Sequence, residues 1–358
     1  MESTPQPSAS QPTPWPLSAP EAPWRHEQAA TLLRLDGPDS LRFLHGQSSQ
    51  DLQLARPGQW RRSCCLSPTA RVTALVDVLA DANGAWLVIS AGDGALVRQQ
   101  LDRVLFPADQ VTLGLAEPVR LIETGPAAAA TSTATAGAGA GASAAVDQDL
   151  WQPLDAAGSQ GFRLGPSRWV LRADTALPPE LVDIPALTAE AAEAWRIHQG
   201  QAAAPAELNG DTNPFELGLA SRVSLNKGCY VGQETLARLV TYDGIKQQLR
   251  RWHWRGPAEQ AERWLELVQP GQLLSTPAGE RAGRITTLLR LKAAPPVGPE
   301  TGEHQAETVL LIGLALVRRT ALEAPVLLPA TAAEGSAPDG SAPQLQLSVP
   351  EAFSLPGD

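Results

Sequence analysis

Cysteine is scarce in this sequence, with three residues among 358. So few thiols exclude a disulfide-stapled scaffold, and they cannot supply the four ligands of a conventional iron–sulfur cluster from this chain alone. They are more typical of a reducing compartment. Histidine is also sparse, and no two of the five residues have the H-x-x-x-H spacing of a zinc site, so no bound metal is expected.

Long apolar runs are missing too. No stretch approaches the roughly 18 consecutive apolar residues of a membrane span, and the start, Met-Glu-Ser-Thr-Pro-Gln, lacks the basic and apolar regions of a secretory signal. We therefore expect a cytoplasmic protein with no membrane partner. Basic residues number 28 against 38 acidic ones, a formal net charge of −10. This balance argues against a broad nucleic-acid surface, so no direct nucleic-acid partner is expected, while a local basic pocket is compatible with it.

Hydrophobic residues, at 43%, are sufficient for a core, and the length corresponds to two to three domains. Residues 1–23 are rich in Pro, Ser, Thr and Gln, which predicts a disordered tail. Helical patterns mixed with hairpin signals indicate an α+β domain over 24–248. Short strands separated by Gly and Pro then predict a small β-barrel over 249–328, and a loop-rich tail over 329–358 could complete it.

A low-complexity segment interrupts the α+β region. Residues 126–146 consist almost entirely of Ala, Gly, Ser and Thr. Their repeated glycines lack the preceding strand and the following helix of a phosphate-binding loop. We interpret the segment as an insertion in a surface loop.

Several elements can be placed from local patterns. Residues 72–79 and 85–90 predict a hairpin around an Asn-Gly turn. Residues 93–105 have the spacing of an amphipathic helix, and 189–199 predict a helix that begins after Thr188. The stretch 249–254 predicts a strand. Three tryptophans of the C-terminal region are expected to fill the barrel core, namely Trp252, Trp254 and Trp264.

One short segment concentrates side chains with chemical potential. Residues 227–234 read Lys-Gly-Cys-Tyr-Val-Gly-Gln-Glu. Because an ammonium group stabilises a nearby thiolate, Lys227 is expected to lower the pKa of Cys229. The alternative is a small buried cysteine without a function, which is the more common role of a lone thiol among apolar residues. The adjacent Cys64 and Cys65 are interpreted as strand residues.

The rest of the segment has the features of a loop pressed against a ligand. Gly228 and Gly232 permit positive φ or close approach of the backbone. Glu234 and Arg238 are four residues apart and can pair across one turn of a helix, and in isolation they would be read as a plain surface pair. The crowding of six chemically distinctive residues around two glycines favours a site.

Residues 227–234 resemble the signature K-G-C-[FY]-x-G-Q-E of the YgfZ family, folate-binding proteins related to the aminomethyltransferase (T-protein) of the glycine cleavage system. Further segments agree with the family in order along the chain. They are Leu35–Asp39, Phe43–Gln47, Asn213–Leu219 and Gly313–Arg319. The resemblance covers about Trp24 to Ala324.

The resemblance implies an α+β, T-protein-like folate-binding core of two ferredoxin-like halves, followed by a small C-terminal β-barrel. It also implies binding of tetrahydrofolate or a folate derivative and a role in the assembly or repair of iron–sulfur enzymes, including those that modify tRNA. The implied partners are folate and iron–sulfur client or assembly proteins. Carried onto this sequence, Cys229 and Lys227 are the motif thiol and its partner. The implied folate contacts are Gly228, Tyr230, Gly232, Gln233, Glu234, Arg238, Gln47, Arg196 and Asp77.

The sequence departs from the T-protein at its acidic positions. The carboxylate that the T-protein has after a glycine-rich turn corresponds to Ala74 or Leu75 here, and Ala70 replaces a glycine of that turn. Asp77 lies two residues beyond Leu75, on the same face of a strand, and is the candidate substitute. An Arg-x-Glu element of the T-protein reads Arg-Ile-His here, at residues 196–198.

These departures favour a folate-binding factor with little or no catalysis. The first alternative is a folate-dependent one-carbon transferase, which would need a positioned carboxylate such as Asp77. The second is a thiol enzyme with Cys229 as nucleophile and His198 as its base. A structural or interaction protein is the remaining reading.

Overall fold

The computed structural model describes residues 14–125, 149–293, 307–330 and 342–357. Two compact units make up the chain. We call the first the sheet unit, and it consists of Ala19–Ala192, Ala202–Ile245 and Ser354–Asp358. The second, the barrel unit, consists of Met1–Ser18, Glu193–Gln201 and Lys246–Phe353. The insertion predicted over 126–146 and the first thirteen residues of the predicted tail lie outside the described residues.

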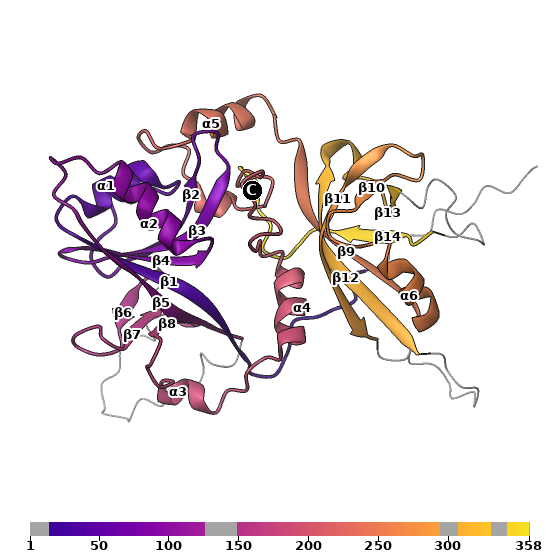
Figure 1. Cartoon of the computed structure of the whole chain (residues 1–358), viewed down its shortest axis with the longest axis horizontal. Helices are drawn as coiled ribbons and strands as arrows, with labels where there is room; N and C mark the ends of the chain where they lie inside the picture. The colour runs from indigo at the N-terminus through magenta and orange to yellow at the C-terminus, as the bar shows by residue number, and fades with distance from the viewer. Residues whose placement is uncertain (1–13, 126–148, 294–306, 331–341, 358) are drawn as a thin grey trace, which may run out of the picture. The chain divides into compact units, whose positions relative to one another are not determined.

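Eight strands form one antiparallel sheet in the sheet unit, in the order β2-β3-β4-β1-β5-β8-β7-β6 (Figure 1). They are β1 Arg25–Asp36, β2 Trp60–Leu66, β3 Val72–Ala80, β4 Gly84–Ala91, β5 Thr112–Thr124, β6 Trp151–Pro153, β7 Gly161–Leu164 and β8 Arg168–Arg172. The helical segments of the unit are α1 Ser40–Gln47, α2 Gly94–Arg103, α3 Pro179–Val182, η1 Ala220–Arg222 and α5 Gln233–Thr241. A further helix, α4, spans Ala189–Gln199, and its residues from Glu193 on belong to the barrel unit.

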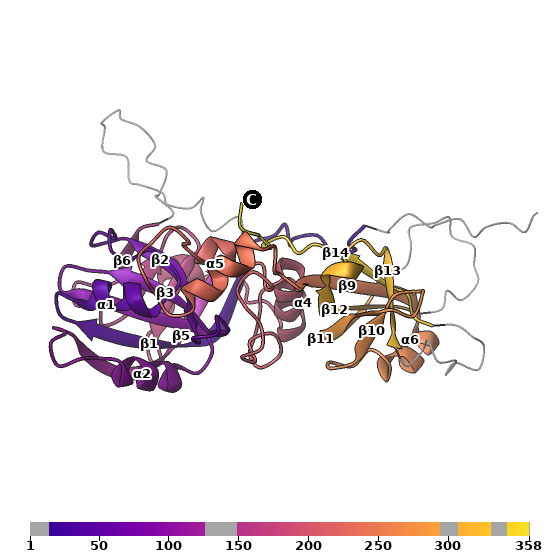
Figure 2. The same ribbon diagram turned by 90° about the horizontal axis from the view of Figure 1, so that it is seen from above.

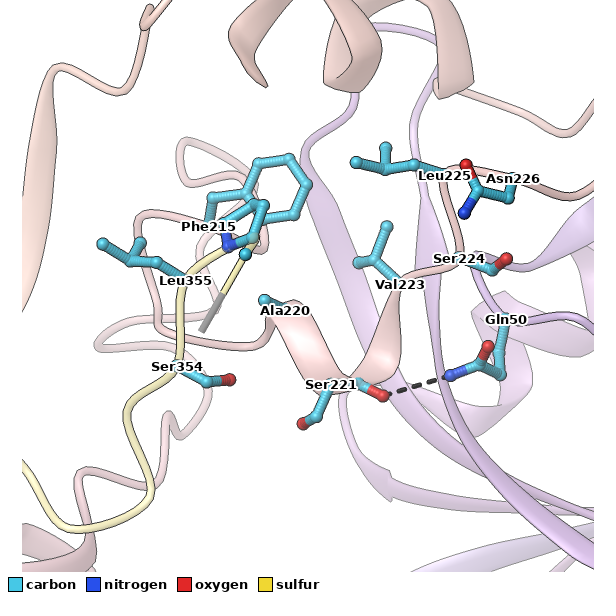
Figure 3. A pocket seen from close by; sticks show the side chains of 12 residues that line it. Gln50, Phe215, Ala220, Ser221, Val223, Ser224, Leu225, Asn226, Ser354 and Leu355 are labelled. Atoms are coloured by element: carbon cyan, nitrogen blue, oxygen red, sulfur yellow. Dashed lines mark hydrogen bonds between the residues drawn. The ribbon is translucent and has the colours of Figure 1, made fainter. Parts of the chain in front are cut away.

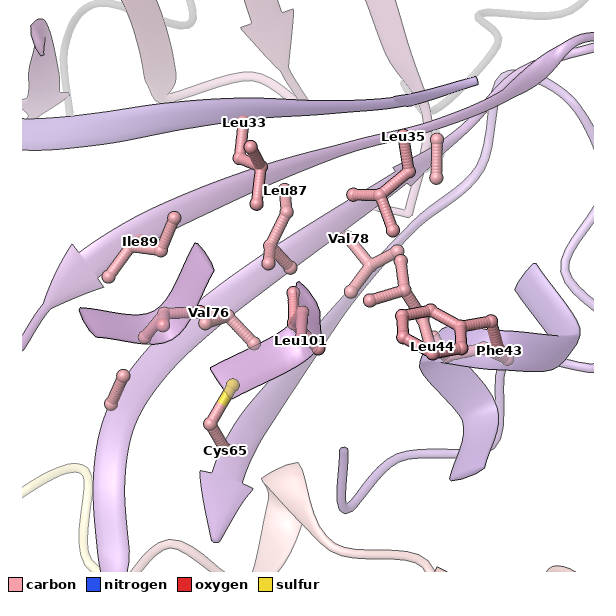
Figure 4. Close-up of a cluster of buried hydrophobic side chains, with 14 of the residues drawn as sticks. Leu33, Leu35, Phe43, Leu44, Cys65, Val76, Val78, Leu87, Ile89 and Leu101 are labelled. Atoms are coloured by element: carbon pink, nitrogen blue, oxygen red, sulfur yellow. The ribbon is translucent and has the colours of Figure 1, made fainter. Parts of the chain in front are cut away.

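The helices α1 and α2 cover one face of this sheet. Because side chains alternate between the faces of a strand, Leu33 and Leu35 of β1 lie on the helix side together with Leu87 of β4 (Figure 4). Leu44 of α1 and Leu101 of α2 pack into the same cluster. Each leucine fully removed from water contributes about 1.5–3 kcal/mol, so this cluster holds both helices on the sheet.

The opposite face of the sheet curls on itself. Its two edges meet where the backbone N–H of Trp60 donates to the carbonyl of Asp149 and Gln59 bridges to Leu150. A second apolar cluster fills the interior, consisting of Leu32, Trp60, Leu79, Val88, Val119, Leu121, Phe162, Leu164 and Val170. Strands that are far apart in the sheet order, such as β3 and β8, thereby come within side-chain contact across the interior.

A closed six-stranded barrel forms the barrel unit, in the order β10-β11-β12-β9-β14-β13 (Figure 2). Its strands are β9 Gln247–Pro257, β10 Leu273–Ser275, β11 Arg281–Lys292, β12 Thr308–Arg318, β13 Val326–Pro329 and β14 Leu345–Ser348. Two helical segments accompany them, α6 Ala258–Leu265 and η2 Arg319–Ala321. Trp264 of α6 packs with Trp252 and Trp254 of β9 in the apolar core, as predicted from the sequence.

The predicted combination of an α+β region and a small barrel is confirmed. The predicted hairpin is formed by β3 and β4. The predicted second helix is α4, and the hydroxyl of Thr188 accepts a hydrogen bond from the backbone N–H of Ala191 at 3.1 Å. Within the described ranges, no helix combines the length and the apolar character needed to span a membrane.

Candidate functional site

The conspicuous motif forms a loop that leads into α5. Gly232 is the N-cap residue of this helix and has φ +83°, in the left-handed region that favours glycine. A Cβ there would lie 3.0 Å from the Cα of Ala70 and from the carbonyl oxygen of Ser67. The glycine therefore allows the loop to pack directly on the β2–β3 turn. Ala70 itself has φ +60°, at the position where the T-protein pattern has a glycine.

Lys227 ties the motif to the segment that follows α1. Its buried ammonium donates to the carbonyl oxygens of His45, Ser48 and Gln50 at 2.5, 2.6 and 2.8 Å. The Nζ also lies 4.4 Å from the ring centre of Tyr230. Burial lowers the pKa of Lys227 to about 7. Because an ammonium has three N–H donors and the three carbonyls take them, none is left to bond a thiolate of the neighbouring cysteine.

The three cysteines have different environments. Cys229 is exposed on the motif loop. Cys64 and Cys65 are buried in β2, as the strand interpretation predicted, and burial raises their pKa values to about 11 and about 12. Because a thiol reacts as its thiolate, the raised pKa values make Cys64 and Cys65 poor nucleophiles. Cys229 is the one of the three cysteines that a reagent or a partner can reach in the folded protein.

The remaining motif residues either pack within the loop or face solvent. Tyr230 is buried, its hydroxyl has no hydrogen-bond partner among the described residues, and burial raises its pKa to about 12. The side-chain amide of Gln233 donates to the carbonyl of Lys227 at 3.1 Å. Glu234 and Arg238 form an exposed ion pair at 2.6 Å, which is the geometry of the plain surface pair.

Two further motif-linked positions lie near this loop. A Cβ on Gly228 would be 3.6 Å from Nε2 of His45, so the glycine packs against the end of α1 at ordinary contact distance. Gln47 is the last residue of α1 and is half-buried. The motif loop and the end of α1 thus form one connected region.

A cavity of about 440 Å³ lies beside this region (Figure 3). It is lined by residues just before the motif, by η1 and by the C-terminal segment, including Gln50, Phe215, Val223, Leu225, Asn226 and Leu355. Its size is within the range of about 300–1,000 Å³ typical of small-molecule sites. Its lining is about equally polar and apolar; we call it the apolar cavity after Phe215, Val223 and the two leucines, which form its hydrophobic part beside the amides of Gln50 and Asn226 and three serines.

A second cavity, of about 510 Å³, lies at the mouth of the curled sheet. Its lining includes Trp60, Arg61, Arg62 and Arg168, and we call it the arginine cavity. Gln50 and Ser221 line both cavities, and the side-chain amide of Gln50 donates to the carbonyl of Ser221 at 3.1 Å (Figure 3). The two cavities are therefore neighbours, separated by this hydrogen-bonded bridge.

Asp77 lies at the centre of a buried ion-pair network beneath the arginine cavity. Its side chain is fully buried, with Oδ2 3.0 Å from Nη1 of Arg168 and Oδ1 3.6 Å from Nη1 of Arg222. Arg168 also pairs with Glu123 at 3.1 Å. A carboxylate enclosed by two guanidinium groups acts as their counter-ion, and burying such charges is tolerable only because they are paired. Contact between Asp77 and a folate stays a prediction.

Arg196 and His198 belong to the barrel unit through the last part of α4. Arg196 pairs with Glu193 at 2.7 Å and donates to the hydroxyl of Thr287 at 3.0 Å. His198 is buried, and its Nδ1 accepts the indole N–H of Trp15 at 2.9 Å. Trp15 lies within the predicted tail 1–23. Both side chains are thus engaged in packing contacts of their own unit.

The structure brings most of the motif together around the end of α1, and it groups Asp77 with three arginines that the sequence did not indicate. Arg62, Arg168 and Arg222 come from β2, β8 and η1, and Gln50 comes from the segment after α1. These residues come together only because the sheet curls on itself. The sequence gives a single local indication of this polar site, the Trp-Arg-Arg run at residues 60–62, since charged residues at the start of a largely buried strand need a polar environment.

Comparison with known proteins shows what the chain is similar to. No family model matches it. A curated protein of Arabidopsis thaliana named "Putative transferase At1g60990, chloroplastic" is 29% identical over 273 residues, which make up 71% of this chain. The matched region is 59% of that protein, so the chain spans well under two thirds of the length of this relative.

Among solved structures, the crystal structure of the glycine cleavage system aminomethyltransferase T from Bartonella henselae matches with a TM-score of 0.64 and 16% identity. The match covers 92% of this chain and 86% of that one. The chain therefore has the fold of the aminomethyltransferase T-protein, as the sequence predicted. At this level of identity the likeness defines the fold alone.

Proposed function

We propose that this protein is a YgfZ-type folate-binding protein that binds tetrahydrofolate in the sheet unit and supports the assembly or repair of iron–sulfur proteins, including enzymes that modify tRNA. Three observations support the proposal: the eight-residue motif at 227–234, the T-protein fold, and the two neighbouring cavities of the sheet unit, one of which is lined by residues just before the motif. The adjacent cavities carry the folate part of the proposal.

The residues of the cavities suit a folate. A flat pterin needs apolar contacts and a few hydrogen-bonding groups, which Phe215, Leu225 and the amides of Gln50 and Asn226 can provide. The acidic end of the molecule needs positive charge, which the arginine cavity provides. When bound, tetrahydrofolate supplies a carrier for a one-carbon unit. Lys227 would keep the binding wall in place by holding the carbonyl of Gln50.

The environment of the T-protein's acidic positions favours a binding role over aminomethyl transfer. Ala74 and Leu75 occupy those positions and are buried in β3. The nearby Asp77 is closed off from solvent and held by Arg168 and Arg222. A general base has to come within hydrogen-bond reach of the proton that it removes, and Asp77 could do so only by leaving its two partners.

Cys229 is the residue that we propose for contact with iron–sulfur partners. It is exposed, and the loop that carries it is fixed by the buried bonds of Lys227 and by the packing of Gly232. A fixed, accessible thiol can form a mixed disulfide or contribute a ligand to a cluster in transit between proteins.

The proposal is tested by measuring the activity of oxygen-sensitive iron–sulfur enzymes in host cells that lack this protein. Supplying the wild-type chain should restore their activity, whereas Cys229→Ser should restore little of it while still binding tetrahydrofolate. Cys65→Ser is the matched control, because that thiol is buried in β2. Equal restoration by wild type and Cys229→Ser would remove the thiol from the proposal. Turnover of an aminomethyl donor by the purified protein, abolished in Asp77→Ala, would favour the transferase instead.

A further inference from the structure

We propose that residues 14–18 form a strap on the barrel unit, which is held at neutral pH and released when His198 takes up a proton. The inference goes beyond the proposed function and does not depend on it, because every side chain that carries it belongs to the barrel unit. The strap reads Pro-Trp-Pro-Leu-Ser, and the side chain of Trp15 is its anchor.

The sequence of the strap favours an anchor made by a side chain. Pro14 and Pro16 have no backbone N–H to donate to a neighbouring strand, and the residue before a proline is restricted to extended backbone. Among the described residues, the indole N–H of Trp15 donates the hydrogen bond that ties the strap to the rest of the barrel unit, and no backbone group of the strap adds another. Docking of the strap therefore depends on the acceptor that this indole meets.

That acceptor is Nδ1 of His198, near the end of α4. The indole nitrogen of Trp15 lies 2.9 Å from it. An imidazole nitrogen accepts a hydrogen bond only while it carries no proton, and both ring nitrogens of a protonated histidine are donors. Protonation therefore removes the acceptor and sets two N–H groups against each other. Turning the ring over gives no relief, since Nε2 is a donor as well, and Trp195 stacks on the ring with the two planes 19° apart.

The charges around His198 determine the direction of the pH dependence. Nη1 of Arg251 lies 3.4 Å from Nδ1 and donates to the carbonyl oxygen of His198 at 2.8 Å, so a proton on Nδ1 would also face a guanidinium. Burial and the charge of Arg251 lower the pKa of His198, while Glu351, which pairs with Arg251 at 3.2 Å, acts in the opposite direction. Among the described residues no other charge reaches this ring: Arg196 and Glu193 of α4 pair with each other.

The sign of the effect follows from the lowered pKa. The docked strap requires a neutral His198, and the docked structure takes up the proton at a lower pH than a free histidine does. Docking is therefore complete above the ordinary histidine pKa of about 6.5 and weakens as the pH falls below it.

A second histidine lies under the same indole. Trp15 meets the ring of His253 edge-on, with ring centres 5.7 Å apart, and packs against the guanidinium of Arg251 at 4.5 Å. His253 is 3% exposed, and its Nδ1 has no hydrogen-bond partner among the described residues. Since His253 makes no hydrogen bond to the strap, His198 is the group that we assign as the trigger. Release of Trp15 would open the side of Arg251 and of both histidines that the indole contacts.

The experiment follows the indole N–H of Trp15 by NMR in the full chain carrying ¹⁵N-labelled tryptophan, with the signal assigned by its loss in Trp15→Phe. Between about pH 7.5 and 4.5 we expect the signal to shift reversibly to the position of a solvent-exposed indole, with a midpoint below about 6.5. His198→Gln should keep Trp15 docked throughout, because the carbonyl of a glutamine side chain accepts an N–H and does not titrate. The matched control is His26→Gln on β1 of the sheet unit, which should behave like the wild type.

Trp252 of the barrel core is the internal reference, because its indole N–H donates to the carbonyl of Leu314. A transition of Trp15 with an unchanged Trp252 signal supports release of the strap. Simultaneous loss of both signals would show that the barrel unit unfolds instead, and it would overturn the proposal. A Trp15 signal that stays in place in the wild type, or a transition that persists in folded His198→Gln, would overturn it as well. The wild-type titration decides the question even if a variant fails to fold.

Discussion

At the scale of single residues, Lys227 was expected to lower the pKa of the Cys229 thiol, but its ammonium instead holds backbone segments together. Lys227 has its three N–H donors on the carbonyls of His45, Ser48 and Gln50. The sequence shows that Lys227 and Cys229 are two residues apart, but it does not show which carbonyls a distant loop will offer. In this loop the hydrogen bonds of the ammonium, and not its sequence neighbours, decide where the side chain lies.

Replacing Lys227 with methionine should destabilise the sheet unit substantially. The change leaves three buried carbonyls without a donor, and an unsatisfied buried polar group costs about 1–3 kcal/mol, so we expect a loss on the order of 3 kcal/mol in the free energy of unfolding. Urea unfolding measures it. Lys292→Met is the control, because the Lys292 side chain is 90% exposed, and it should change stability by less than about 0.5 kcal/mol. Equal effects of the two substitutions would show that the buried bonds of Lys227 contribute nothing to stability.

At the scale of elements, the sequence predicts those whose signal is local. The hairpin β3–β4, the helix α2 with its N-cap Asp93, and α4 all have caps or turns within a few residues. The curl that closes the mouth of the sheet has no such signal, because it depends on a bridge between Gln59 and Leu150. The arginine cavity could not be predicted for the same reason, and the binding role of the motif residues stays a prediction.

The packing of α5 on the β2–β3 turn predicts different costs for two glycine substitutions. Gly232 and Gly210 have nearly the same φ, +83° and +82°, but a Cβ on Gly210 meets nothing within 4 Å. Gly210→Ala should therefore cost only the backbone strain, about 1 kcal/mol. Gly232→Ala adds the 3.0 Å contacts with Ala70 and Ser67, so thermal or urea unfolding should show a clearly larger loss. Comparable losses of stability for the two substitutions would mean that the β2–β3 turn moves away from the added Cβ at no cost in free energy.

The first described residues of the chain dock on the barrel unit through two histidines. Trp15 contacts the ring of His253 edge-on, with ring centres 5.7 Å apart, and donates to His198. Arg251 packs over Trp15 at 4.5 Å, and Glu351 pairs with Arg251. Burial and the charge of Arg251 lower the pKa of His253 to about 4, and they also lower the pKa of His198.

These shifts give the barrel unit a defined dependence on pH. Because His253 takes up its proton at a lower pH in the folded than in the unfolded chain, its contribution is complete above the ordinary histidine pKa of about 6.5 and is lost as the pH falls to about 4. The loss should be on the order of 3 kcal/mol. Unfolding measured between pH 7 and 4 should show it in the wild type, and less of it in His253→Gln. A parallel decline in the two proteins would assign the acid sensitivity to other groups.

At the scale of the whole molecule, the motif at 227–234 directly follows residues that line a cavity large enough for a small ligand. The fold, the barrel with its tryptophan core and the position of the motif follow from the sequence, because they depend on periodic patterns and on one matched signature. The two cavities depend on how η1, the C-terminal segment and the curled sheet meet, and contacts between such distant segments leave no local pattern.

The measurement that tests the central claim most directly is a calorimetric titration of the full chain with tetrahydrofolate, beside the variant Ser224→Trp, which places a large ring in the apolar cavity. The account predicts a dissociation constant in the micromolar range for the wild type and at least a tenfold weaker one for the variant. The control Ala108→Trp adds the same ring on an exposed turn that lines neither cavity, and it should bind like the wild type. No binding by the wild type, or unchanged binding by folded Ser224→Trp, would contradict the account.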